Sequence, residues 1–141
     1  MKPPVLRFLT WAFGIAMLLA GAPVLAHHAF TAEFDAKKPV TIRGFVTKVE
    51  WTNPHVWVYL DVKDEAGAWK SWGFEMGAPH QLQGRGWTRE LLKIGDELVV
   101  EGMMAKSGPG KMNGRNVTFA ATGKKLGAAS SEGQTTAPAT P

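Results

Sequence analysis

The 141 residues contain no cysteine, and 16 basic residues against 12 acidic ones leave a formal charge of only +4. The lack of cysteine excludes disulfides, a thiol nucleophile and a structural zinc site built on thiolates. The nearly balanced charge argues against nucleic acid as a partner, because phosphate contacts require clustered Lys and Arg side chains.

The first 26 residues have the pattern of a cleavable secretory signal. Lys2 and Arg7 precede an apolar run over residues 8–20, and a small-residue exit segment ends at Ala26. The apolar run is shorter than the roughly 20 residues that a membrane-spanning helix needs. We therefore expect cleavage after Ala26, export to the periplasm, contact with the membrane only during export, and a mature chain that starts at His27.

Residues 27–39 are expected to form an extended N-terminal arm, because they follow neither the helical nor the strand period. The domain proper is expected over residues 40–126. Its first strand signal covers residues 40–51, and Gly44 within that strand predicts a bulge. After the break at Thr52-Asn53-Pro54, residues 55–63 alternate in a way typical of a strand with one buried face. That face would carry Val56, Val58, Leu60 and Val62.

The second half of the domain continues with shorter elements. A return strand is predicted over residues 68–76, and a short helix over residues 89–92 with Thr88 as its N-cap. Two further strands, residues 97–104 and 115–121, flank a glycine-rich loop over residues 107–114. The tail, residues 127–141, is rich in Ala, Ser, Thr, Gly and Pro, and is expected to be disordered.

This order of elements predicts a mainly β protein. Three strands, one short helix and two strands are the element order of the OB-fold, a five-stranded Greek-key barrel. We therefore expect a small OB-like barrel with its helix between the third and fourth strands. A generic five-stranded open barrel is the alternative.

Four stretches together resemble a bacterial family of small secreted proteins of unknown function. They are His27-His28-Ala29-Phe30, Val49-Glu50-Trp51-Thr52-Asn53-Pro54-His55, Gly86-Trp87-Thr88-Arg89 and Gly95-Asp96. The resemblance extends over about residues 27–126. It implies a periplasmic protein with an OB-like barrel, and it implies no activity.

Signal cleavage would make His27 the first residue, with a free α-amine beside its imidazole. The amine and the Nδ1 atom of His27 can chelate one ion, and a third nitrogen from His28 or His55 would complete a set suited to Cu(II). Glu33 and Asp35 are candidate oxygen ligands. The alternative is that the two histidines are only polar, mobile residues at a chain end.

A second hypothesis places a ligand on the polar face of the strand over residues 55–63. His55, Trp57 and Tyr59 share that face, and Asn53 precedes it. The corresponding face of OB-folds binds oligonucleotides or oligosaccharides, and aromatic rings stack on bases or sugars. In the alternative interpretation, Asn53 only stabilises a turn, and both rings pack beneath the N-terminal arm.

An enzyme is not expected. The chain contains no Gly-x-Ser-x-Gly elbow and no phosphate-binding glycine motif, and Glu75 and Glu101 are expected to be outward strand residues. The sequence thus favours a non-enzymatic periplasmic binding protein that holds copper through His27. The alternative is a module without metal that binds a small ligand, a saccharide or an envelope protein through its aromatic face.

Overall fold

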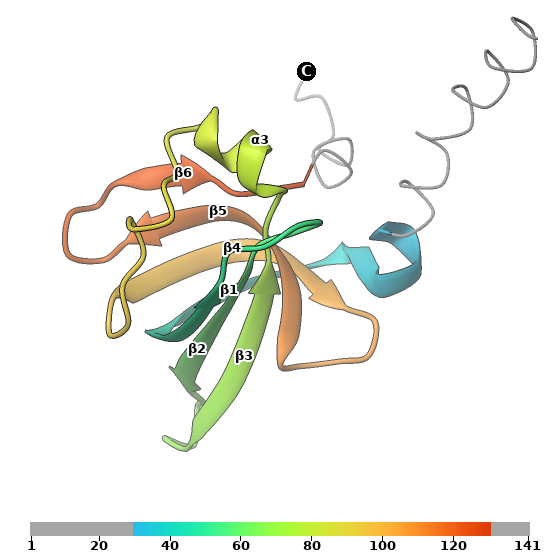
Figure 1. The fold of residues 1–141 in the computed structure, drawn as a ribbon. Helices are drawn as coiled ribbons and strands as arrows, with labels where there is room; N and C mark the ends of the chain where they lie inside the picture. The colour runs from blue at the N-terminus through green and yellow to red at the C-terminus, as the bar shows by residue number, and fades with distance from the viewer. Residues whose placement is uncertain (1–29, 131–141) are drawn as a thin grey trace, which may run out of the picture.

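The computed structural model describes residues 30–130, which form a mainly β fold of six strands and two short helical segments (Figure 1). The first helical segment covers residues 30–33. The remaining elements in chain order are β1 (Phe34–Glu50), β2 (Trp57–Lys63), β3 (Trp69–Glu75), α3 (Pro79–Gln83), β4 (Glu97–Ala105), β5 (Lys111–Phe119) and β6 (Lys125–Gly127).

The strands form one sheet that closes on itself. Antiparallel pairing gives the order β3-β2-β1-β4-β5-β6, and an additional parallel pairing joins β3 to β5. Strands β1 to β5 therefore make a ring, and α3 and β6 lie together at one end of it (Figure 1). The structure thus contains one strand more than the five expected, because the short β6 pairs with β5 after a tight turn.

The long strand β1 makes the ring possible because it pairs with β4 along its first part and with β2 along its second part. The register with β2 shifts between Val46 and Lys48, so the predicted bulge lies three residues beyond Gly44. Gly44 has a different role: a Cβ atom there would collide with the backbone carbonyl of Asp61. Its lack of a side chain allows β1 and β2 to approach closely.

The core lies inside the ring and is built by alternation. The predicted inward face of β2 is confirmed, since Val56, Val58 and Leu60 are fully buried and Val62 nearly so. Side chains from β3, β4 and β5 meet that face. The fully buried apolar residues from these strands are Phe74, Leu98, Val100, Met112 and Val117.

The helix between β3 and β4 lies earlier in the chain than predicted. Residues 88–92 form a turn rather than a helix, and α3 covers Pro79–Gln83 instead. Proline is well suited to the first turn of a helix, and the buried Leu82 anchors α3 to the core. The segment predicted as a helix, residues 89–92, lies between the buried side chains of Trp87 and Leu92. It contains a single turn, in which the amide of Leu91 donates to the carbonyl of Thr88.

The two ends of the described chain also differ from the expected boundaries. Residues 34–39 already belong to β1, residues 30–33 are helical rather than extended, and β5 begins at Lys111 rather than at residue 115. Gly127 is the last residue of β6, and Trp87 Nε1 donates to its carbonyl at 2.8 Å. The first part of the predicted disordered tail is ordered, since Ala128, Ala129 and Ser130 are buried and the amide of Gly77 donates to the carbonyl of Ala128 at 2.8 Å. The predicted signal peptide and residues 131–141 of the predicted tail lie outside the described residues. Between residues 30 and 130 there is no helix with the length and apolar character needed to cross a membrane.

The alternation along β2 predicts opposite responses at neighbouring positions. Leu60→Ala should lower the free energy of unfolding by about 3 kcal/mol, because it leaves a cavity in the closed ring. Asp61→Ala, on the exposed face, should change it by less than about 0.5 kcal/mol. Denaturant unfolding of the two variants measures both values. Equal losses at both positions would contradict this register.

Candidate functional site

An open hollow of about 350 Å³ lies on the outer face of the sheet, where β2, β3 and the start of β5 meet. Trp57 and Tyr59 form its apolar wall, with ring centroids 6.5 Å apart and ring planes inclined by 26°. The two rings are therefore neighbours with nearly parallel planes, and together they are called the aromatic shelf. The residues that line the hollow are Trp57, Tyr59, Ser71, Gly73, Gly110 and Lys111.

The hollow is kept open by a glycine. Gly73 lies directly across the strand pair from Tyr59, and a Cβ atom at Gly73 would stand 3.3 Å from Cε1 of that ring. That distance is tighter than ordinary van der Waals contact, so a side chain at this position would press against the aromatic shelf. The backbone of β3 instead forms the floor.

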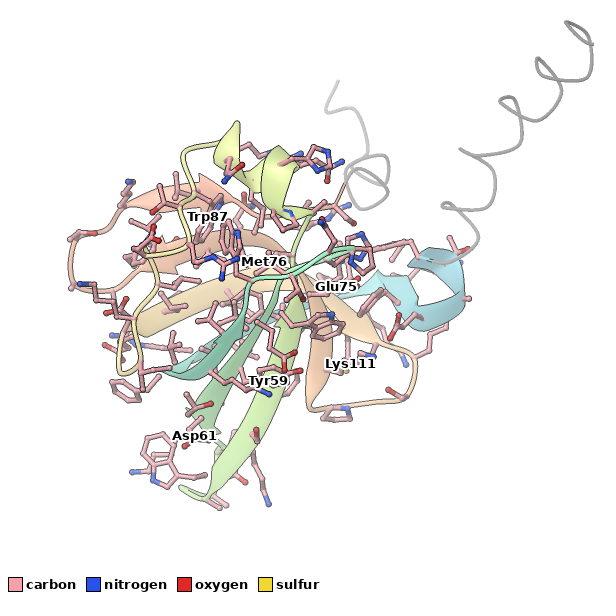
Figure 2. All side chains as sticks on the ribbon, in the orientation of Figure 1. Tyr59, Asp61, Glu75, Met76, Trp87 and Lys111 are labelled. Carbon is pink, nitrogen blue, oxygen red and sulfur yellow. The ribbon has the colours of Figure 1, made fainter. Side chains whose placement is uncertain are left out.

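A cation stands at each end of the shelf. The ammonium group of Lys111 lies 4.9 Å from the centroid of Trp57, and that of Lys48 lies 5.3 Å from the centroid of Tyr59. Lys111, labelled in Figure 2, also pairs with Glu33, the last residue of the helical turn at the start of the described chain. Lys48 pairs with Glu50 at 2.5 Å.

Glu50 also accepts a hydrogen bond of 3.1 Å from the Tyr59 hydroxyl. The hydrogen bonds from Lys48 and Tyr59 lower the pKa of Glu50, so its carboxylate stays charged. Burial, and then the bond to Glu50, raise the pKa of Tyr59, so its hydroxyl remains a proton donor. The Tyr59 end of the shelf is therefore bordered by a carboxylate as well as an ammonium group.

A second cluster of polar groups lies beside the Trp57 end of the shelf. His55 Nδ1 bonds to Oε1 of Glu75, which is directly opposite Trp57 in the β2–β3 register. The Glu75 side chain is only 10% exposed and that of His55 is 29% exposed. A neutral imidazole that donates from Nδ1 carries its lone pair on Nε2, the form in which histidine ligates metals.

The next position across the sheet is also polar and buried. Asn113 on β5 is the register partner of Glu75 and is fully buried. Neither atom of its side-chain amide has a hydrogen-bond partner among residues 30–130. Glu75 and Asn113 thus form a row of buried polar groups on the outer face of the sheet.

The start of the described chain covers this row. Phe30 and Phe34 are buried against Met103 and Ala105, and Trp57 packs against the same cluster. The backbone amide of Lys106 donates to the carbonyl of Glu33 at 2.8 Å, and its ammonium group bonds to the carbonyl of Thr31. The segment that begins at Phe30 therefore runs beside Trp57. The indole ring of Trp57 has one side packed against this segment and another side that lines the hollow.

The structure brings some of the residues singled out in the sequence together and separates others. Trp57 and Tyr59 share the hollow, and His55 lies next to it without lining it. Asn53 is exposed in the bend before β2, where the Asn53–Pro54 peptide bond is cis. His27 and His28 lie outside the described residues.

The two acidic residues proposed as oxygen ligands are engaged otherwise. Glu33 pairs with Lys111, and the Asp35 side chain accepts a hydrogen bond of 3.0 Å from the amide of Lys37. Within residues 30–130, no three His, Cys, Asp or Glu side chains gather closely enough to hold a metal ion.

Sequence reasoning missed Glu75 and Lys111 as members of these sites. Glu75 faces outward as expected, yet it is buried beneath the incoming chain. Lys111 fell in a predicted loop but begins β5, where it pairs with Gly73. The alternation of β3 places Glu75 on the same sheet face as Trp57. The sequence near β3 contains no signal that predicts its parallel pairing with β5.

A family model matches residues 16–116, and it describes a family of unknown function, DUF6152. The chain belongs to that family. No curated protein and no solved structure matches it. The matched segment includes every residue of the hollow and the His55–Glu75 pair, so both lie within the region that defines the family.

The lowered pKa of Glu50 predicts a pH-dependent contribution to stability. The ionised carboxylate stabilises the fold above its ordinary pKa of 4.5, and this contribution disappears as the pH falls through the lowered value in the folded state. We expect Glu50→Gln to destabilise the protein at neutral pH and to approach the parent stability in acid. Unfolding by denaturant across this pH range measures the difference, with Asp61→Asn as the control. A pH-independent difference would contradict the assignment.

Proposed function

We propose that this chain is an exported, non-enzymatic binding protein of the periplasm, and that it holds copper through its processed N-terminus. The His27 amine and Nδ1 atom would supply two nitrogens, and His55 or His28 a third. The observation that carries the proposal is the bond between His55 Nδ1 and the buried carboxylate of Glu75. Histidines that ligate metals commonly donate their other ring N–H to a carboxylate, which orients the ring.

The path of the chain supports the same site. Phe30 is buried in the cluster that packs against Trp57, and Trp57 is opposite Glu75. His27 precedes Phe30 by three residues, a span of about 10 Å when extended. The first residue of the processed chain can therefore reach the edge of the sheet where His55 lies.

We also propose that the ring of strands is an OB-like Greek-key barrel. The cyclic pairing β1-β2-β3-β5-β4, with a helix between β3 and β4, supports it. In OB-folds the second and third strands carry the binding face, and both the hollow and His55–Glu75 lie along these two strands.

Copper titration of protein that begins at His27 tests the proposal. We expect tight binding of one Cu(II) ion, and loss of that binding when one extra glycine precedes His27, because the amine then becomes an amide. Isothermal calorimetry and the electron paramagnetic resonance spectrum of Cu(II) report affinity and nitrogen ligation. Equal affinity of the two proteins would overturn the proposal.

The role of the carboxylate is tested separately. Glu75→Gln should weaken Cu(II) binding by about 10- to 100-fold, because a neutral amide replaces the carboxylate that orients the His55 ring and raises its basicity. His55→Ala should weaken it at least as much if His55 is the third ligand. Glu101→Gln, on β4, is the matched control and should leave the affinity unchanged.

A second candidate function is a module without metal that binds a ligand through the aromatic face. The hollow lined by Trp57, Tyr59 and Lys111 favours it, because aromatic walls with a few polar groups are typical of ligand sites. The two candidates use different atoms of the same sheet face.

A further inference from the structure

We infer that the hollow binds a short saccharide bearing a carboxylate, with sugar rings on Trp57 and Tyr59 and the carboxylate on Lys111. This inference rests on the second candidate function and names its ligand. It depends on three features of the hollow: a flat aromatic shelf, a cation whose present partner is exchangeable, and a carboxylate at the opposite end.

The shelf suits the flat face of a sugar ring. Trp57 and Tyr59 follow one another along one face of β2, with their planes inclined by only 26°. Two adjacent rings in this arrangement can each support one ring of a chain molecule, because stacking needs only an accessible aromatic face. Ser71, with its hydroxyl group, and the backbone of Gly110 line the same hollow beside the rings. They are suitable partners for sugar hydroxyls.

Lys111 provides the site for the acid. Its ammonium group lies over Trp57 and lines the hollow, and its partner is Glu33. Both side chains of this pair are about 40% exposed, at 39% and 43%. Ion pairs this exposed contribute little to stability, so a ligand carboxylate can take the place of Glu33 at low cost.

The opposite end of the shelf rejects a second anion. Glu50 remains ionised beside the Tyr59 hydroxyl and neutralises Lys48. A polymer with a charge on every unit, such as a nucleic acid, would bring a phosphate against this carboxylate. The charges therefore favour one carboxylate at the Trp57 end and neutral hydroxyl groups at the Tyr59 end.

The β2–β3 hairpin contains a matched control pair at its other end. Lys63 lies 5.7 Å from the ring centroid of Trp69, which is 56% exposed. This pair has the same cation and the same ring as Lys111 and Trp57, but neither residue lines the hollow. Substitutions in this control pair show whether binding needs the hollow itself or only an exposed aromatic ring beside a lysine.

The test compares cellobiouronate, a disaccharide with a single carboxylate, with its methyl ester, which has the same rings without the charge. Binding to the purified protein is followed by tryptophan fluorescence and by backbone amide shifts at Gly73 and Gly110. We expect the acid to bind about tenfold more tightly than the ester at low salt, the equivalent of one charge-assisted hydrogen bond. Added salt should reduce this preference.

The variants assign the preference to its residues. Lys111→Ala, a surface change, should bring the affinity for the acid down to that for the ester, and Lys111→Arg should restore most of it. Lys63→Ala should change neither. Trp57→Leu should weaken both saccharides, whereas Trp69→Leu should weaken neither. Folding of each variant is verified by its amide spectrum.

Two results would overturn the inference in different ways. If acid and ester bind equally and Trp57→Leu still weakens both, the protein binds saccharides but does not recognise their carboxylate. If neither saccharide binds, or if the amide shifts change only outside the hollow, the hollow is not a saccharide site. Copper titration of the Lys111→Ala protein decides the first proposed function independently, since Lys111 has no part in that site.

Discussion

The parallel pairing of β3 with β5 is the contact on which both candidate sites depend. It closes the ring of strands, and it places Lys111 beside Gly73 and Asn113 beside Glu75. The backbone amide of Gly73 donates to the carbonyl of Gly110 at 2.9 Å, so the closure brings in the loop before β5 as well. Without this pairing, the hollow would have an aromatic wall but would lack Lys111, and Glu75 would lie at an open sheet edge. The same pairing therefore closes the core and brings together the residues of both candidate sites.

The side chain of Glu75 is only 10% exposed, and a polar group removed from water destabilises the fold unless a partner compensates for it. His55 is that partner. The fully buried amide of Asn113 has no hydrogen-bond partner within residues 30–130 and adds a second unfavourable contribution. An apolar pair would pack at the same register without these costs. The proposed metal site therefore rests on the His55–Glu75 pair rather than on the histidine alone.

The sequence predicted the strands well, because alternation is a local signal. The four inward residues of segment 55–63 and the position of Trp57 and Tyr59 on the opposite face follow directly from it. The N-cap residue Thr88 favours a helix over residues 89–92, but the segment forms only a turn between the buried side chains of Trp87 and Leu92. The hollow was only partly predictable, because tertiary contacts also determine which residues line it. Trp57 and Tyr59 belong to one strand, whereas Lys111 and Glu33 reach them through pairings that no local pattern contains.

Trp57 joins the two candidate sites and so determines which positions can separate them. One part of its ring packs against the Phe30 cluster, which leads back to His27, and another part lines the hollow. A substitution at Trp57 therefore alters the path of the N-terminal segment and the ligand shelf together. Glu75 bonds to the histidine without lining the hollow, and Lys111 lines the hollow and pairs with Glu33. These two positions, on β3 and β5, distinguish the proposed copper site from the proposed saccharide site, although the two lie side by side on one sheet face.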